Sequence, residues 1–297
     1  MAELLSKLGL GTAQWGLAYG ISNQSGQTTQ NEVARIIKFA RQSGINVIDT
    51  ARTYGQAEQV LGKNDLSGYK IITKIPPLNN LDMSLRPLEE WLDVSFAMSL
   101  ASMGVDSVQG LLVHNCDDLF SQSKPVILQF LNKLKALGKC HQVGVSVYSA
   151  AQIEKVLDLF TPDIIQLPFS VFDQRLLLDG TLAFLKKCDV EIHARSIFLQ
   201  GLLLMKMEDI PTYFRPWLPQ ISAWNQLCSD IGLPLQHAAL DYVITNEYID
   251  KAIIGVENLS QLVDLTSSAF GNDLSLLESL SLSDPEILNP SFWKLKS

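Results

Sequence analysis

Cysteine is scarce in this chain, and its four copies show no paired or metal-type spacing. Such a pattern predicts free thiols, as is usual for a protein of the reducing cytoplasm, rather than a disulfide framework. The four histidines also include no pair at metal-ligand spacing. We therefore expect a cytoplasmic protein without a bound metal. The cysteines are Cys116, Cys140, Cys188 and Cys228.

Basic residues are also fewer than acidic residues. The chain has 23 Lys and Arg against 31 Asp and Glu, a formal net charge of -8, and no basic run offsets this balance. Nucleic acid is excluded as an expected partner, because phosphate binding needs clustered cations. The first residues do not read as a signal peptide, and no segment reaches the ~18 consecutive apolar residues of a membrane span. We expect no membrane partner.

A G-x-G-x-x-G run after the first strand-like segment is missing, which argues against an open, doubly wound dinucleotide-binding sheet. Instead, eight short apolar segments alternate with helical patterns, one of them from Leu177 to Lys187. This alternation predicts a parallel sheet with helical crossovers. The count and the length fit a closed (β/α)8 TIM barrel of the α/β class. The expected strands are Leu8–Thr12, Ile45–Ile48, Lys70–Thr73, Val108–Val113, Gln142–Val145, Ile164–Leu167, Val190–Ala194 and Ala252–Ile254.

No linker divides the chain, so we expect a single domain over residues 1–297. Its hydrophobic fraction of 47% is ample for one sizeable core. A further apolar stretch follows the last expected strand and helix. We interpret it as a C-terminal extension that starts at about residue 271.

Polar side chains occur where three successive expected strands end. Asp49 closes the second strand, Lys74 the third and His114 the fourth, while Tyr54 follows Asp49 by five positions. Barrel enzymes carry their active sites at the C-terminal ends of the strands. Taken singly, each residue has an ordinary explanation, such as a turn cap, a solvated loop lysine or a buried histidine. Together and in this order, they favour a proton-donating site.

This constellation resembles the aldo-keto reductase superfamily, and the resemblance covers roughly residues 5 to 270. The chain is similar to the bacterial members, and several short motifs carry the likeness. They are Gly9-Leu10-Gly11-Thr12-Ala13, Asp49-Thr50-Ala51 with Tyr54-Gly55 and Glu58, Lys74, His114, Gly144-Val145-Ser146, Gln166, Ser196, Gly201-Leu202-Leu203, and Ile253-Ile254-Gly255 with Leu262.

The resemblance implies hydride transfer between a nicotinamide cofactor and an aldehyde, ketone or sugar carbonyl. Such a reaction needs a group that protonates the carbonyl oxygen. The family roles would make Tyr54 the donor, with Lys74 and Asp49 tuning it and His114 orienting the carbonyl. A lysine ammonium beside a phenol makes the proton easier to give, because it stabilises the phenolate.

The resemblance also implies a cofactor site. Ser146 and Gln166 match residues that hold the nicotinamide carboxamide, whereas Arg195 replaces the aromatic that usually stacks on the ring. A guanidinium plane can also stack on a ring. The remaining expected cofactor contacts are Thr12, Ser196, Phe198, Gly201, Gly255, Glu257, Gln261 and Asp264.

Cofactor choice is left open between NADPH and NADH. The family default is NADPH, but no basic residue lies between Lys251 and Phe270 to clamp a 2′-phosphate. Glu257 would repel that phosphate and accept a hydrogen bond from a 2′-hydroxyl.

Aromatic residues near the barrel mouth are the candidates for substrate binding, because they pack well against a sugar face or an apolar aldehyde. They are Trp15, Phe169 and Trp217. Ordinary loop packing is the alternative for all three. Two other functions stay open, a non-catalytic nucleotide-binding regulatory subunit of the same family and a different barrel enzyme.

Overall fold

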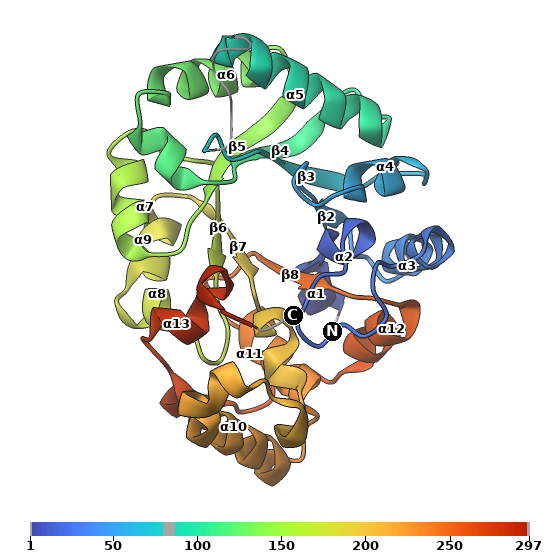
Figure 1. Cartoon of the computed structure of the whole chain (residues 1–297), viewed down its shortest axis with the longest axis vertical. Coiled ribbons are helices and arrows are strands. Elements are labelled where there is room, and N and C mark those ends of the chain that lie inside the picture. The colour runs from blue at the N-terminus through green and yellow to red at the C-terminus, as the bar shows by residue number, and fades with distance from the viewer. Residues whose placement is uncertain (1, 80–86, 296–297) are drawn as a thin grey trace.

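The computed structural model describes residues 2–79 and 87–295 and shows a closed barrel of parallel strands in sequence order (Figure 1). The predicted TIM barrel of one domain is confirmed. Each strand pairs with its neighbours in the chain, and β1 closes the barrel against β8. The strands are β1 (Leu8–Gly11), β2 (Val47–Asp49), β3 (Lys70–Ile75), β4 (Val108–Val113), β5 (Cys140–Ser146), β6 (Ile164–Pro168), β7 (Glu191–Arg195) and β8 (Lys251–Gly255).

Helices surround the barrel (Figure 1). In α3, the Thr29 side chain caps the first turn, and the apolar residues recur at near-helical spacing on the face turned to the core. The α-helices are α1 (Ala2–Ser6), α2 (Ala13–Gly16), α3 (Gln30–Gln42), α4 (Ala57–Gly62), α5 (Leu88–Met103), α6 (Lys124–Ala136), α7 (Ala150–Leu157), α8 (Arg175–Leu178), α9 (Thr181–Lys187), α10 (Leu218–Ile231), α11 (Leu235–Ile244), α12 (Leu259–Ser267) and α13 (Pro285–Leu288). The 3-10 helices are η1 (Cys116–Phe120), η2 (Leu199–Leu204), η3 (Met207–Asp209), η4 (Thr212–Trp217), η5 (Ser275–Leu280) and η6 (Pro290–Phe292).

The prediction of one continuous helix from Leu177 to Lys187 was wrong. The structure has two short helices, α8 and α9, in this region. Gly180 separates them with a φ of 80°, a left-handed conformation that a helix cannot continue through. The side chain of Asp179 then accepts a hydrogen bond from the backbone of Thr181 at 2.9 Å and starts the second helix.

Five apolar strand residues pack together inside the barrel as a cluster of their own. The polar residues of the candidate site lie one layer further along the same strands. Side chains alternate between the two faces of a strand, so residues two positions later point the same way. Two residues after each cluster member stands Asp49, Lys74, His114, Gln166 or Gly255. The cluster consists of Val47, Ile72, Leu112, Ile164 and Ile253.

The segment after α12 returns across the barrel to the loop that follows β6, and Figure 1 shows red α13 near α8. The backbone N–H of Leu282 donates to the carbonyl of Phe172 at 2.8 Å. The Gln174 side chain donates to the carbonyl of Leu277 at 3.0 Å. The segment is therefore attached to the barrel by main-chain groups as well as by apolar contacts.

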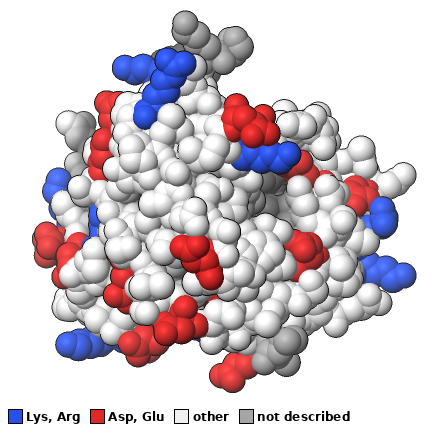
Figure 2. Space-filling model, turned by 90° about the horizontal axis from the view of Figure 1, so that it is seen from below, with Lys and Arg blue, Asp and Glu red and all other residues white. Residues whose placement is uncertain are grey.

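Figure 2 shows one face of the molecule on which uncharged residues dominate and Lys and Arg lie scattered, without a cluster at its centre. Among residues 2–79 and 87–295, no helix is long and apolar enough to span a membrane. No cluster of metal-ligating side chains occurs in the same part of the chain.

Candidate active site

Asp49 and Lys74 form an ion pair inside the barrel, below the C-terminal ends of β2 and β3. The Lys74 ammonium donates to both carboxylate oxygens of Asp49, at 2.8 and 2.7 Å, and to the backbone carbonyl of Thr50 at 3.0 Å. These three contacts hold the ammonium in place. Burial lowers the pKa of Lys74, but the charge of Asp49 and the neighbouring Tyr54 together raise it above its usual value. The lysine is thus a fixed positive charge.

Tyr54 lies directly above this pair, with Lys74 Nζ 5.1 Å from the centroid of its ring. The turn that carries it is held by a close contact between α2 and the chain before α4. A Cβ on Gly16 would collide with the backbone carbonyl of Tyr54, so only glycine allows this approach. Burial raises the pKa of Tyr54, and the charge of Lys74 opposes that shift. The net direction is upward, so the phenol keeps its proton at neutral pH.

His114 faces the same space from the end of β4. Its ring meets the ring of Tyr54 edge to face at a centroid distance of 5.9 Å, and Thr53 Oγ1 lies 3.2 Å from its Nδ1. Burial, followed by the charges of Lys74 and Arg195, lowers the pKa of His114 to about 3. The imidazole is therefore neutral at pH 7. Where its Nδ1 accepts a hydrogen bond from the Thr53 hydroxyl, the ring proton is on Nε2.

A cavity of about 500 Å³ opens at the C-terminal ends of the strands and extends from Asp49, Tyr54 and His114 to the start of α12. Lys74 lies beneath it. Every residue that the sequence nominated for the cofactor borders this cavity. These residues are Thr12, Ser146, Gln166, Arg195, Ser196, Phe198, Gly201, Gly255, Glu257, Gln261 and Asp264.

Gln166 connects the ion pair to the cavity. Its side-chain nitrogen donates to Asp49 at 2.7 Å, which leaves its amide oxygen as the acceptor that borders the cavity. Thr12 also borders the cavity; it is fully buried, and its hydroxyl donates to that of Thr50 at 2.8 Å. An acceptor of this kind fits the NH2 of a carboxamide.

Two loops meet along the middle of the cavity. The N–H of Ile21, after β1, donates to the carbonyl of Gln200, after β7, at 2.9 Å. A Cβ on Gly201 would collide with Ser22, so the backbones approach as only glycine permits. Of the four non-glycine residues with positive φ in the described chain, three are in this loop, namely Ser196, Leu199 and Gln200. Such strain gathers where a backbone is shaped for a ligand.

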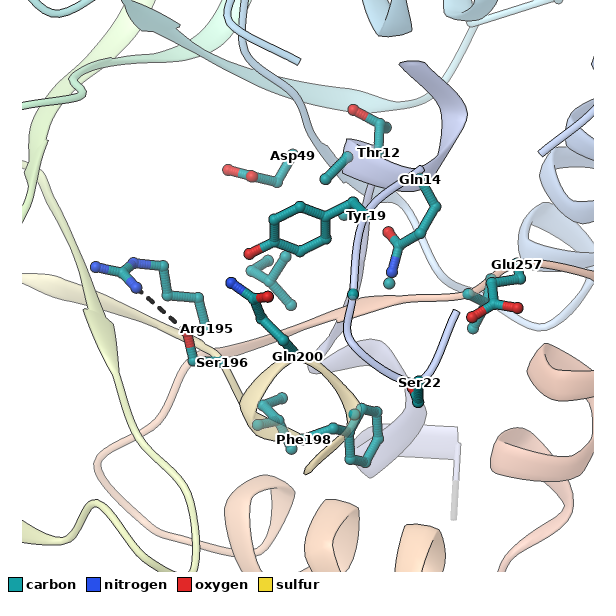
Figure 3. A pocket seen from close by; sticks show the side chains of 18 of the residues that line it. Thr12, Gln14, Tyr19, Ser22, Asp49, Arg195, Ser196, Phe198, Gln200 and Glu257 are labelled. Atoms are coloured by element: carbon teal, nitrogen blue, oxygen red, sulfur yellow. Dashed lines mark hydrogen bonds between the residues drawn. The ribbon is translucent and has the colours of Figure 1, made fainter. Parts of the chain in front are cut away.

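The far end of the cavity is acidic and amide-rich (Figure 3, where Glu257 marks it). Gln261 accepts from the N–H of Glu257 at 2.7 Å, and Gln236 donates to Asp264 at 3.0 Å. Burial raises the pKa of Glu257. Arg195 is the only Lys or Arg among the described residues that line the cavity, and it lies at the other end.

The aromatic residues nominated for the substrate lie elsewhere, because they belong to the packing of the fold. Trp15 and Phe169 are fully buried, and the Phe169 ring stacks on Tyr242. Trp217 packs against Tyr213 and bonds to Asp284. Trp15, Phe169 and Trp217 are absent from the described lining of the cavity.

The residues that sequence reasoning missed are polar or tyrosine side chains from the segments that follow β1, β5 and β7, and two of them, Gln14 and Gln236, lie on the helices α2 and α11. Tyr19 and Gln200 appear in Figure 3 beside Arg195. Tyr19 had one usable signal, since it precedes Gly20 in the Gly-containing loop, but loop contacts across the barrel have no periodicity to reveal them. The missed side chains are Gln14, Tyr19, Ser22, Tyr148, Gln200 and Gln236.

The family model described as "Aldo/keto reductase family" matches residues 7–274. The chain belongs to this family. The resemblance inferred from its motifs is therefore confirmed, and the protein is an NAD(P)-dependent oxidoreductase of the aldo-keto reductase family.

Similar proteins extend over most of the chain. It is 25% identical to the L-galactose dehydrogenase of Arabidopsis thaliana, over 96% of this chain and 89% of that protein. It is 27% identical to the NADH-specific methylglyoxal reductase of Escherichia coli, over 84% and 86% of the two chains. The solved holo form of aldo-keto reductase AKR11C1 from Bacillus halodurans superposes with a TM-score of 0.71 at 19% identity, covering 92% of this chain and 90% of that one.

Proposed function

We propose that this protein transfers a hydride between a nicotinamide cofactor and a small aldehyde, ketone or sugar carbonyl, with Tyr54 as the proton donor. The observation that carries the proposal is the stack of Tyr54 over the buried Lys74–Asp49 pair, beside a neutral His114. All four side chains project from one barrel end. A regulatory subunit without catalysis would have no use for a buried ion pair beneath a protonated tyrosine.

The cofactor would extend along the cavity, and its chemical contribution is a hydride for the carbonyl carbon. Ser146 and the acceptor oxygen of Gln166 would hold its carboxamide, and Arg195 would lie beside the ring. Thr12, Ser196, Phe198, Gly201 and Gly255 would line its path towards the far end. The glycine at 201 and the strained loop around it fit a ligand that needs close backbone approach, such as a pyrophosphate.

During reduction, the carbonyl oxygen would accept hydrogen bonds from the Tyr54 hydroxyl and from Nε2–H of His114. As the hydride reaches the carbon, the electron pair of the C=O π bond takes the phenolic proton and becomes the O–H bond of the alcohol. The phenolate that remains is stabilised by Lys74, whose own charge is balanced by Asp49. The chain's residues thus supply the proton and hold the oxygen in place.

Cofactor preference at the far end would favour NADH. Glu257, Gln261 and Asp264 offer acceptors to ribose hydroxyls and no cation to a 2′-phosphate. The E. coli relative is named as NADH-specific, which agrees with this assignment. The protein's free cysteines fit a cytoplasmic location.

Tyr54→Phe tests the proposal. The variant should lose ~100-fold or more in kcat for reduction of a small aldehyde, the usual size of a general-acid effect. Its dissociation constant for NADH, measured by fluorescence titration, should stay within about threefold because the phenol contributes little to cofactor binding. Tyr19→Phe is the matched control, since it removes a hydroxyl from the same cavity and should cost far less. Wild-type turnover in the Tyr54 variant would refute the assignment.

A further inference from the structure

Arg195 is a cation without an ionic partner. It is the last residue of β7, and its guanidinium donates to the carbonyl of Val147 at 3.1 Å and to the hydroxyl of Ser196 at 3.2 Å. It also lies over the ring of Tyr148, 4.2 Å from the centroid. All three partners are neutral, and Arg195 forms no ion pair among the described residues. The nearby Arg175, by contrast, pairs with Asp173 at 2.7 Å.

The charge of Arg195 acts at the catalytic end of the cavity. Together with burial and Lys74, it lowers the pKa of His114 to about 3, and it opposes the burial that raises the pKa of Tyr54. The charges there are one negative on Asp49 and one positive each on Lys74 and Arg195, with His114 neutral. The catalytic end therefore has a net charge of one positive unit, and Arg195 supplies it.

Two reacting groups must meet at this end if the proposed function holds. The proton and the hydride go to adjacent atoms of one carbonyl, so the nicotinamide ring must lie ~3–3.5 Å from a carbon whose oxygen contacts Tyr54. The oxidised ring carries a positive charge, and the reduced ring carries none. A pocket with one excess positive charge distinguishes between the two forms.

We propose that Arg195 makes this site bind the reduced nicotinamide cofactor more tightly than the oxidised one, and so raises the reduction potential of the bound couple. The inference rests on the proposed function and concerns its direction. At ~7 Å and an effective dielectric constant of ~20–40, repulsion between unit charges corresponds to roughly a 10- to 100-fold difference in affinity. For a two-electron couple that is about 30–60 mV.

The consequence is a site biased towards alcohol oxidation relative to the same pocket with a neutral residue at this position. In that direction the alcohol carbon gives up its hydrogen with both bonding electrons as hydride, and the hydroxyl proton passes to the Tyr54 phenolate. The substrate loses two electrons, and the nicotinamide gains them. The charge of Arg195 moves the equilibrium on the protein and leaves that in solution unchanged.

The test is equilibrium binding of NAD+ and NADH, measured by calorimetry on the wild type, Arg195→Gln and Arg195→Lys. The ratio of the NAD+ to the NADH dissociation constant should fall roughly 10- to 100-fold in Arg195→Gln. It should stay within about threefold of wild type in Arg195→Lys, which keeps the charge and loses the planar group. ADP-ribose, which lacks nicotinamide, should bind all three proteins alike and so reports on the integrity of the pocket.

An equal ratio in the wild type and Arg195→Gln overturns the proposal, and so does a lysine variant that behaves like the glutamine variant. Where Arg195→Gln weakens ADP-ribose binding, Arg195→Met provides a second neutral replacement for the same comparison. Failure of the wild type to bind any of NAD+, NADH, NADP+ and NADPH overturns the proposed function itself. That outcome is distinct from binding of both forms with an unaltered ratio.

Discussion

Lys74 illustrates how a single residue serves the fold and the site together. Its side chain is fully buried, and its ammonium bonds to Asp49 and the Thr50 carbonyl. Because Tyr54 lies above it, its charge opposes the burial that raises the pKa of the phenol. Removing one partner of a buried pair typically costs ~3–5 kcal/mol of unfolding free energy, since the other charge is left uncompensated.

Lys74→Met should therefore lower both stability and activity. Reduction needs a protonated Tyr54, so wild-type activity falls as pH rises through the pKa of the phenol. Without Lys74 that pKa is higher, and the fall should move to higher pH. The measurements are urea unfolding and a pH profile of kcat/KM. Asp49→Asn added to Lys74→Met should restore much of the stability but not the activity. Full activity with an unchanged profile would show that Lys74 plays no part in the chemistry.

At the scale of the element, β8 and α12 present acids where a phosphate clamp needs cations. Glu257 lies between the end of β8 and the N-cap residue Asn258, which accepts from the N–H of Gln261 at 3.0 Å. The local backbone is thus fixed by side-chain bonds, and a substitution at 257 changes charge more than shape.

Glu257→Arg should move the cofactor preference towards NADPH. A charge-assisted contact with the 2′-phosphate is worth about 1.5–3 kcal/mol, which corresponds to a roughly 10- to 100-fold change in the ratio of the two dissociation constants. Glu208→Arg makes the same charge change at an exposed position of η3 and should leave the ratio unchanged. A wild type that already binds NADPH a hundredfold more tightly than NADH would contradict the expectation.

The sequence predicted the features that depend on residues close together in the chain, such as the strands and the polar residues at their ends. The ends of the short apolar strands place Asp49, Lys74 and His114 at one end of the barrel, and that pattern is visible in the chain. It did not predict which aromatic residues face the cavity. Trp15 points into the core because α2, which was not expected, turns it there. Tyr148 borders the cavity through a loop whose path depends on distant partners.

At the scale of the whole molecule, we propose that the segment from about residue 271 is a C-terminal extension that folds together with the barrel as one domain. Asp241 on α11 is fully buried, and its carboxylate accepts from the N–H of Gly271 at 2.8 Å and from that of Asn272 at 3.1 Å. The Asn272 side chain adds a third bond at 2.6 Å. Three hydrogen bonds to one buried carboxylate anchor the start of this segment.

Asp241→Asn should destabilise the whole protein by roughly 2–3 kcal/mol, because hydrogen bonds to a charged group are the strong ones and an amide cannot accept at both positions. Thermal unfolding should remain one transition at a lower Tm, since the extension and the barrel share a core. Asp273→Asn, at an exposed neighbouring position, is the control. Two separate transitions in the wild type would show that the extension is an independent unit.

The complete burial of Lys74 has a kinetic consequence for turnover. A lysine side chain that is fully buried has no solvent from which to regain a proton, so it cannot be the source of the proton that Tyr54 gives up in each reduction. Under the proposed mechanism, the replacement proton has to enter through the mouth of the cavity, along the route by which the product leaves. Reprotonation of Tyr54 and release of the product are then coupled. A solvent isotope effect on turnover would therefore report on product release as well as on the proton transfer to the substrate.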